Sequence, residues 1–577
     1  MKKIKKICKM ISWAVPMTAL FLMNVGMTAW ASAKEGTSAA ATVSAETQAP
    51  LIPAPTEKAS IATVIQGSDV KITGSVSGNV SDPAYYDNYL YLFELQPYQD
   101  DLLGRSDYSA WITKGEALAF TKPLNLGTKE DRLYSKFVIA VYDGQKYTPI
   151  SNAAYVSNPE VLAKNTAEFR DPQTKKGLLI EQSMLADAME LGVKHVIVNI
   201  PFHHILGTGI DYEYDGKTYH FNKALMEEYD NTITRMSDKN ILVTAVILNG
   251  WNDQTPQLIH PNASKSSSAF YYGFNASTKE GYETIKAIAT FLAERYGGGS
   301  NSHGKISNWI IGNEINNNKV WNYMGKMEVG EYVREYEKAF RVFYTAIRSI
   351  NKNDRLYFST DYNWNDKTTT KLNYSAKDIV DLFNQEVIKG GQMDWGLAYH
   401  PYSIPLTEPE FWDDDQTGLI RNDPSSNVIN FKNLSVLTDY LQKPELRTSA
   451  NTVRHVILSE QGFTSKSATK GVNNQLQAAA FAYAYYIADS NPYIDAFIMS
   501  RQVDAVSEAK DSLSFGLWEC DMNSPNVVKA TKRKKIWATF RVIDSKNSLE
   551  ATEFAKEIIG INKWSDVIPN FKWRRYE

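Results

Sequence analysis

From residue 158 to the C-terminus, short apolar runs alternate with longer amphipathic stretches, and this alternation restricts the fold more than any other feature. Runs such as HVIVNI at residues 195–200 are typical of parallel strands that are covered on both faces. Each run is followed by a stretch with helical spacing of apolar residues, which predicts repeated βα units. Eight strands are expected, over residues 177–180, 195–201, 241–249, 306–313, 355–361, 395–400, 455–460 and 494–502.

A set of eight βα units favours a closed barrel over an open α/β sheet. A doubly wound sheet that binds a nucleotide carries a G-x-G-x-x-G turn after its first strand, or a phosphate-binding P-loop. The sequence contains neither motif at the corresponding place. We therefore expect an α/β fold in which a (β/α)8 TIM barrel occupies residues 158–577.

Residues 60–157 show a different pattern, in which short alternating runs are separated by Gly, Asp, Asn and Pro. This pattern predicts a small Ig-like β-sandwich domain ahead of the barrel. A second domain also fits the length, because 577 residues exceed the usual size of a single core. The sandwich is either a carbohydrate-binding module or a structural spacer. We favour the spacer, because a fold alone does not establish binding.

The N-terminus has the three parts of a bacterial-type secretory signal. A cationic start, MKKIKKICKM, precedes an apolar stretch over residues 11–27 and the small-residue sequence Ala31-Ser32-Ala33. We assign residues 1–33 to a signal peptide and the Ala-, Thr- and Pro-rich residues 34–59 to a flexible linker. An uncleaved membrane anchor is the alternative, which Pro16 and Asn24 disfavour. We expect a protein that is secreted, extracellular or associated with the cell envelope, without stable membrane insertion after cleavage.

The charge balance indicates the class of partner. The chain has 62 Lys and Arg against 65 Asp and Glu, a formal net charge of −3. Such a chain has no basic field with which to bind nucleic acid. The charge balance of the chain is more consistent with a neutral substrate than with a nucleic acid or an anionic lipid. After signal cleavage only Cys520 remains, so no disulfide can form within the chain.

Two glutamates stand where predicted strands end, and the carboxyl ends of the strands carry the active site in barrels of this kind. The fourth strand ends in NWIIGNE, which includes Asn313 and Glu314, and the seventh ends in HVILSE, which includes Glu460. Two carboxyl groups across a barrel mouth can flank one glycosidic bond. One protonates the leaving oxygen, and the other attacks the anomeric carbon or activates water. The spacing between the two carboxyls decides between retention and inversion, and the sequence leaves this open.

These residues resemble the large clan of retaining (β/α)8-barrel glycoside hydrolases known as clan A, over residues 158 to about 545. The resemblance implies that Glu314 is the general acid/base, Asn313 binds the sugar 2-hydroxyl and Glu460 is the nucleophile. We expect no cofactor and no metal. The final strand departs from the clan pattern, because it ends in Ser500-Arg501-Gln502 rather than in Trp.

Other polar and aromatic residues at strand ends are candidates for substrate binding, since rings stack on sugar faces and amides bind hydroxyls. His400 ends the sixth strand and Tyr402 follows it, and in similar clan members groups at this place hold the nucleophile or the sugar. The weaker candidates lie at or after the second, third, fifth and eighth strands: His203, Asn249, Trp251, Asp361 and Trp518.

Two other functions compete with glycoside hydrolysis. A metal-dependent hydrolase needs converging His and Asp ligands, but the chain has only eight His and no H-E-x-x-H motif. A catalytically inactive glycan-binding or surface protein on a barrel scaffold is the second alternative. The presence of both glutamates favours the enzyme. We expect a monomer that acts on an oligo- or polysaccharide.

Overall fold

The structure of the protein is a computed structural model that describes residues 58–77, 87–299, 302–366, 370–524, 527–571 and 573–576. The predicted signal peptide and nearly all of the predicted linker lie outside these residues. Strand β1 begins at Ala59, so the first sheet starts one residue before the expected boundary at Ser60.

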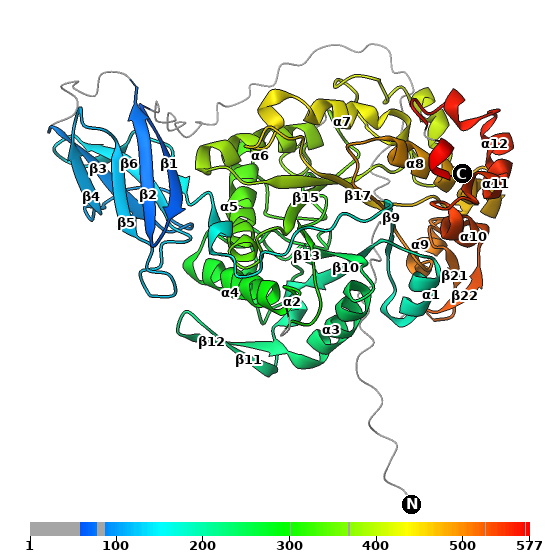
Figure 1. The fold of residues 1–577 in the computed structure, drawn as a ribbon, viewed down its shortest axis with the longest axis horizontal. Coiled ribbons are helices and arrows are strands. Elements are labelled where there is room, and N and C mark those ends of the chain that lie inside the picture. The colour runs from blue at the N-terminus through cyan, green and yellow to red at the C-terminus, as the bar shows by residue number, and fades with distance from the viewer. Residues whose placement is uncertain are drawn as a thin grey trace, which may run out of the picture.

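The centre of the molecule is a closed barrel of parallel strands, as predicted (Figure 1). Its strands pair in chain order, and the last strand pairs with the first. The barrel strands are β9 (Lys176–Leu179), β10 (His195–Pro201), β13 (Leu242–Leu248), β14 (Asn308–Ile311), β15 (Arg355–Asp361), β16 (Trp395–His400), β17 (Val456–Gln461) and β20 (Ala496–Met499).

The barrel strands are buried on both sides. Every residue of β13, with the sequence LVTAVIL, is buried, because its side chains point alternately into the barrel and toward the surrounding helices. The inward residues, including Ile197, Val246, Ile310 and Ile457, form a separate apolar cluster. This cluster is the floor of the barrel mouth.

Helices connect successive barrel strands on the outside of the barrel. Several begin at a side chain that caps the first turn, at Asn222, Thr278, Ser375 and Asn473. The connecting helices are α1 (Leu185–Glu190), α3 (Lys223–Ser237), α4 (Lys279–Arg295), α5 (Val329–Arg348), α6 (Ala376–Gly390), α7 (Ser435–Leu441) and α8 (Asn474–Ser490). Short helices α2 (Phe202–Ile205) and α9 (Val506–Lys510) follow β10 and β20.

Over residues 58–77 and 87–157, the part of the chain before the barrel that the structure describes, the strands form two antiparallel sheets. One has the order β1-β2-β5, and the other has the order β4-β3-β6-β7, with β8 paired to β6. Side chains from both sheets, among them Ile61, Ile72, Leu92 and Ile139, belong to one buried cluster. The strands are β1 (Ala59–Gln66), β2 (Asp69–Val76), β3 (Tyr89–Leu95), β4 (Ala110–Thr113), β5 (Ala119–Pro123), β6 (Lys136–Tyr142), β7 (Tyr147–Pro149) and β8 (Ala154–Tyr155).

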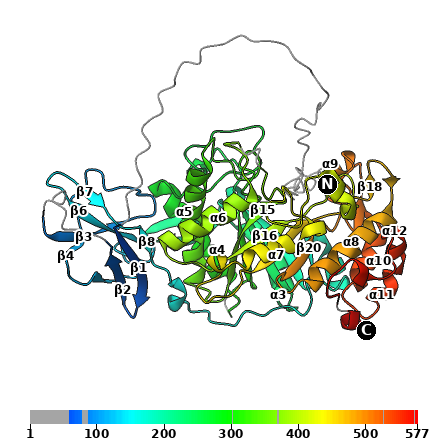
Figure 2. The same ribbon diagram turned by 90° about the horizontal axis from the view of Figure 1, so that it is seen from above.

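The N-terminal sheets lie at one end of the molecule, beside α4, α5 and α6 (Figures 1 and 2). Polar contacts fix them to α5. The ammonium of Lys338 lies 2.8 Å from the carboxylate of Asp100, and the guanidinium of Arg341 lies 4.7 Å from the ring centre of Tyr155. These contacts involve buried side chains on the helix, so they hold the sheets against the barrel wall.

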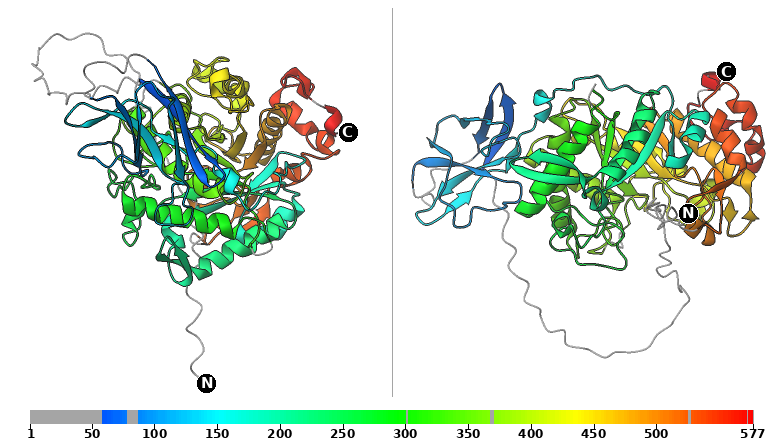
Figure 3. Two further views of the ribbon diagram at one scale, coloured as in Figure 1. Left: turned by 60° about the vertical axis from the view of Figure 1, so that its left-hand side comes forward. Right: turned by 90° about the horizontal axis from the view of Figure 1, so that it is seen from below.

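The C-terminal segment covers the barrel at the other end (Figures 2 and 3). Helix α8 is buried almost all round because it lies between the barrel and α10 (Lys535–Val542) and α12 (Glu553–Ile559). Helix α11 (Ser548–Ala551) joins them. Three two-stranded hairpins lie outside the barrel: β11 (Gly209–Tyr214) with β12 (Lys217–Asn222), β18 (Lys466–Ser467) with β19 (Gly471–Val472), and β21 (Trp518–Cys520) with β22 (Ala530–Arg533). Within the described ranges, no helix is long and apolar enough to cross a membrane.

Candidate active site

The fourth barrel strand places Glu314 at the mouth through a tight turn. β14 ends at Ile311, and Gly312 and Glu314 both have a positive φ, of 79° and 36°. A glutamate in this backbone region is uncommon and is held there by its surroundings. The backbone N–H of Glu314 donates to Oγ of Ser359 on the next strand at 2.7 Å. The turn therefore fixes a buried carboxyl group, only 7% exposed, at the end of the strand.

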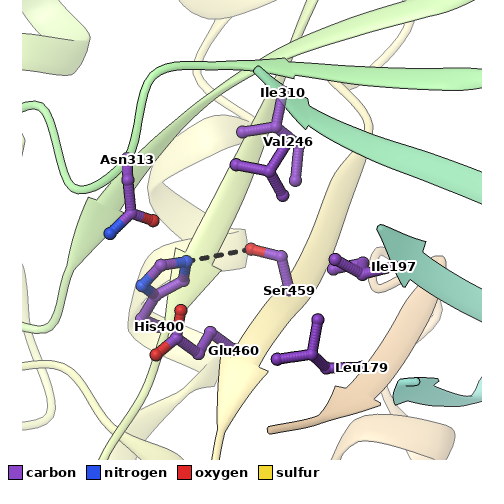
Figure 4. Close-up of a pocket in the computed structure, with 8 residues that line it drawn as sticks. All are labelled: Leu179, Ile197, Val246, Ile310, Asn313, His400, Ser459 and Glu460. Carbon is purple, nitrogen blue, oxygen red and sulfur yellow. Dashed lines mark hydrogen bonds between the residues drawn. The ribbon is translucent and has the colours of Figure 1, made fainter. Parts of the chain in front are cut away.

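His400, at the end of β16, connects Glu314 to the seventh strand. Its Nδ1 lies 2.9 Å from Oε1 of Glu314. Its Nε2 lies 3.0 Å from Oγ of Ser459, a contact drawn in Figure 4. All three side chains are buried. One proton between Glu314 and His400 therefore belongs to the pair rather than to either residue alone.

Burial sets the charge of this pair. It raises the pKa of Glu314 to about 7, while the hydrogen bond and charge of His400 oppose the rise and the charges of Asp361 and Glu460 add to it. Burial lowers the pKa of His400, but the neighbouring carboxyls of Glu314, Glu460 and Asp361 outweigh it and raise this pKa overall. Glu314 therefore holds a proton well above the pH at which an ordinary glutamic acid loses it.

Glu460, on β17, is held by a different partner. The hydroxyl of Tyr402 donates to its Oε1 at 2.8 Å. Tyr402 is buried and packs against Phe515, with ring centres 5.8 Å apart. Burial and the charge of Glu460 raise the pKa of Tyr402 well above its usual value, so the phenol stays a donor. Glu460 is thus fixed by a neutral donor, and Glu314 is paired with a titratable imidazole.

A cavity lined by His400, Ser459 and Glu460 lies above the apolar floor of the barrel (Figure 4). Four polar side chains line its mouth side, and four apolar side chains from the barrel interior line its base. The lining residues are Asn313, His400, Ser459, Glu460, Leu179, Ile197, Val246 and Ile310. The structure therefore brings together Asn313, His400 and Glu460, and Glu314 and Tyr402 are bound directly to members of this set.

Asp361, a predicted substrate-binding residue, makes several hydrogen bonds within the protein. Its carboxylate accepts hydrogen bonds from the side chain of Asn316 at 2.7 Å and from the backbone and side chain of Asn363, both at 2.8 Å. Its own N–H donates back to Asn316 at 3.0 Å. Because these bonds occupy the carboxylate, Asp361 holds the loop that carries Glu314.

Three further candidates hold the loops after β10 and β13 and do not line the cavity. The amide of Asn249 donates to the carbonyls of Leu258 and Gly273, which closes the loop after β13. Nδ1 of His203 accepts the N–H of Gly250 at 2.8 Å, and burial lowers the pKa of His203 to about 3. The indole of Trp251 donates to Asp253 at 2.6 Å. Each of these side chains is thus hydrogen-bonded within the protein, and their contacts with a sugar stay predictions.

Trp518 is also absent from the residues that line the cavity. It lies in the hairpin of β21 and β22, and its indole donates to Asp187 of α1 at 3.0 Å. The guanidinium of Arg533 lies 5.0 Å from its ring centre. The indole therefore contacts α1 and Arg533, which position in the sequence could not reveal.

Residues that the sequence did not single out complete the site. Ser459 lines the cavity together with its neighbour Glu460, although successive side chains of a regular strand point to opposite faces. The pairing of β17 with β20 shifts register between Leu458 and Gln461, and this irregularity breaks the alternation.

A third carboxyl, on the fully buried Glu508, is paired with Arg501 at 2.5 Å. Burial raises the pKa of Glu508 to about 7, and the charge of Glu460 contributes to the rise.

The chemistry of the site is that of carboxyl groups, an imidazole and a phenol. Among the residues that the structure describes, no group of three or more His, Cys, Asp or Glu side chains is arranged to hold a metal ion. The acid pair Glu314–His400 and the carboxylate of Glu460 can transfer a proton and attack an electrophilic carbon.

Comparison with solved structures finds several glycoside hydrolases. A family 39 glycoside hydrolase from Bacteroides cellulosilyticus WH2 is 15% identical, with a TM-score of 0.44 over 81% of this chain and 79% of that chain. A β-glucuronidase from Ruminococcus gnavus is 9% identical, with a TM-score of 0.35 over 84% and 67% of the two chains. A family 1 β-glucosidase from Thermotoga maritima is 15% identical, with a TM-score of 0.39 over 62% and 84%. At these values the similarities carry no functional assignment.

The remaining comparisons concern sequence families. No curated protein matches the chain. One family description, "Family of unknown function (DUF5722)", matches residues 168–567, which include every barrel strand and both glutamates. Because this match spans more than half of the 577 residues, the chain belongs to the DUF5722 family.

Proposed function

We propose that this protein is a glycoside hydrolase in which Glu314 is the general acid/base and Glu460 is the nucleophile. The observation that carries the proposal is the asymmetry between the two carboxyls. Burial keeps a proton on Glu314 up to about pH 7, whereas Glu460 is held by the neutral hydroxyl of Tyr402. A pair of carboxyls with an acid and a base in neighbouring environments is what glycosidic cleavage requires.

The proposed reaction proceeds with retention. Glu314 donates its proton to the glycosidic oxygen as the carboxylate of Glu460 attacks the anomeric carbon, and the carbon–oxygen bond to the leaving group breaks. Formation of the ester removes the negative charge of Glu460, which helps to raise the pKa of Glu314. Glu314 therefore becomes a stronger acid and then serves as the base. It takes a proton from water, the water oxygen attacks the anomeric carbon, and Glu460 leaves as a carboxylate.

The neighbours of the two glutamates fit supporting roles in this reaction. His400 lies between Glu314 and Ser459, so it can hold the acid in one orientation through both protonation states. Asn313 lines the same cavity as Glu460, which supports the proposal that it binds a sugar hydroxyl. By the resemblance to clan A, this hydroxyl is the 2-hydroxyl.

The remaining features of the proposal concern the whole protein. We propose that residues 1–33 direct export, that the enzyme acts outside the cell or at its envelope, and that it is a monomer acting on an oligo- or polysaccharide. The two N-terminal sheets are proposed to form a β-sandwich spacer. The contact of Asp100 with Lys338 and that of Tyr155 with Arg341 attach these sheets to α5, as expected of a fixed spacer.

A panel of glycans tests the proposal. Purified protein is incubated with plant, microbial and host poly- and oligosaccharides, and the reducing sugar released is quantified beside a Glu460→Gln variant. We expect cleavage of at least one glycan by the wild type and none above background by the variant. Equal binding of a glycan by both proteins without cleavage would instead support an inactive glycan-binding protein.

Replacement of His400 should change the pH dependence of kcat/KM. The hydrogen bond and charge of His400 lower the pKa of Glu314, so a His400→Leu variant should have a Glu314 that stays protonated to higher pH. Since the acid must be protonated for the first step, the alkaline limb of kcat/KM should move to higher pH, with a lower maximum. The profile of a His203→Leu variant, which alters a histidine outside the cavity, should keep the alkaline limb of the wild type. An unchanged limb in His400→Leu would contradict the proposed pairing.

A further inference from the structure

Three aromatic side chains form a row from the barrel mouth to the surface. Tyr271 is buried, with 8% exposed, Trp321 is half-buried, and Phe270 is 44% exposed. The ring centres of Tyr271 and Trp321 are 6.0 Å apart with planes inclined by 29°, and those of Trp321 and Phe270 are 5.4 Å apart with planes inclined by 30°. Neighbouring rings are therefore moderately tilted to each other, and their exposure increases along the row.

The inner end of the row adjoins the candidate active site. Tyr271 belongs to the same apolar cluster as Ile197, Val246 and Ile310, and Trp321 packs against this cluster. These three aliphatic residues also line the cavity that contains Glu460. The negative charge of Glu460 contributes to a raised pKa of Tyr271, after the larger effect of burial, which agrees with this proximity.

The backbone ties the row to the loop that carries Glu314. The N–H of Asn317 donates to the carbonyl of Glu314 at 2.7 Å, and the N–H of Trp321 donates to the carbonyl of Asn317 at 3.0 Å. The N–H of Phe270 donates to the carbonyl of Val320 at 2.8 Å. The loops after β13 and β14 thus form one unit, in which the rings have a fixed position relative to the acid.

On the opposite side of the barrel mouth, Trp518 has other partners than an aromatic row. β20 is followed by Arg501, which pairs with Glu508, and the indole of Trp518 is bound to Asp187. A half-buried and an exposed ring next to a polar cavity offer apolar surface that a ligand can cover. Sugar rings present apolar C–H faces and polar edges, and aromatic side chains suit such faces.

We propose that Trp321 and Phe270 form the stacking platform for the sugar units on the leaving-group side of the scissile bond, and that the substrate is a neutral oligosaccharide chain. This inference rests on the proposed function, because Glu314 defines the leaving-group side. Trp321 follows Glu314 in the same loop, so the sugar released by protonation from Glu314 lies toward Trp321. The unit beyond it lies toward Phe270, at the surface.

Binding to an inactive protein tests the platform apart from catalysis. Neutral oligosaccharides of glucose, xylose, mannose and galactose are titrated into the Glu460→Gln variant, and tryptophan fluorescence and calorimetry are recorded. For the sugar series that binds, adding Trp321→Ala should weaken affinity about tenfold, which corresponds to about 1.4 kcal/mol, and Phe270→Ala should weaken it about threefold for the longer chains only. Trp321→Phe should recover most of the loss. Trp111→Ala, which removes a half-exposed ring from the N-terminal sheets, is the matched control and should leave affinity unchanged.

Kinetics with two kinds of leaving group then locate the platform. Trp321→Ala should lower kcat/KM about tenfold for an oligosaccharide and leave it unchanged for the glycosyl fluoride of the same sugar, whose leaving group cannot stack. Equal losses for both substrates, or no loss with either, would overturn the inference while the hydrolase stands. Binding that depends on Trp321 without any cleavage would refute the hydrolase and the leaving-group assignment together, and would leave Trp321 as part of a sugar-binding surface. Binding of none of the oligosaccharides would overturn the platform.

Discussion

Replacing each glutamate by glutamine should produce two different kinetic defects. Glu460→Gln should lower kcat by about 10⁴-fold or more for every leaving group, because an amide cannot replace the attacking carboxylate. Glu314→Gln should lower kcat/KM by about 10²–10⁴-fold for a sugar leaving group, which requires protonation. It should have little effect on kcat/KM for a dinitrophenyl leaving group, which departs without a proton. In that case the glycosyl-enzyme should accumulate, because the base for the second step is missing.

Rates with both leaving groups, measured for the two variants side by side, check this asymmetry. Asp361→Asn serves as the matched control, since Asp361 is a buried acid near Glu314 that is bound to Asn316 and Asn363. Its loss of activity with the sugar leaving group should be smaller than that of Glu314→Gln, because Asp361 contributes to the raised pKa of Glu314 but does not donate the proton. If Glu314→Gln lost as much activity with the dinitrophenyl substrate as with the sugar, Glu314 would not be the acid.

The largest effect on stability is expected from Lys534→Met. Lys534 is 4% exposed, and its ammonium lies 2.8 Å from Oδ1 of Asp504 and 3.1 Å from both the hydroxyl of Ser465 and the carbonyl of Ser514. Removing one partner of a buried ion pair leaves the other charge unpaired in the interior. The free energy of unfolding should fall by about 3–5 kcal/mol.

The loss of unfolding free energy in Lys534→Met should depend on pH. Burial raises the pKa of Asp504 and the charge of Lys534 lowers it, so the variant has an Asp504 with a still higher pKa in the folded state. A folded carboxyl that binds its proton more tightly than the unfolded chain loses stability as pH rises above the unfolded pKa. Urea unfolding at pH 5 and pH 8 should therefore show the greater deficit at pH 8.

An exposed ion pair provides the control for this measurement. Lys529 pairs with Asp521 at 3.0 Å, but its side chain is 65% exposed. Lys529→Met should cost less than about 1 kcal/mol. Equal losses in Lys529→Met and Lys534→Met would contradict the importance of burial.

The barrel was predictable because its strands are continuous apolar runs. The predicted strands over residues 195–201, 355–361 and 395–400 have the bounds that the structure shows for β10, β15 and β16. The prediction for β14 was too long. It included Gly312 and Asn313, but Gly312 has a φ of 79°, which ends the extended conformation before the apolar run reaches its polar tip. A local turn of this kind is not encoded in hydrophobic periodicity.

The candidate site was predictable where strand order alone sets position, as for Glu314, His400 and Glu460. It was not predictable where a side chain has a choice of partners. An amide at a strand end can bind a sugar or a loop carbonyl, and Asn249 binds the carbonyls of Leu258 and Gly273. Ser459 was missed because the register shift in β17 interrupts the regular alternation of side chains between the two faces of the strand. These outcomes depend on contacts between distant segments.

Covalent labelling tests the two-glutamate mechanism most directly. Once the panel has identified the cleaved sugar, the protein is incubated with its 2-deoxy-2-fluoro dinitrophenyl glycoside, which slows hydrolysis of the intermediate, and the digested protein is analysed by mass spectrometry. A retaining mechanism predicts one fluoroglycosyl group on the peptide that contains Glu460, and none in Glu460→Gln. Attachment to a different residue, or turnover of the natural substrate with inversion and no labelled peptide, would contradict Glu460 as the nucleophile.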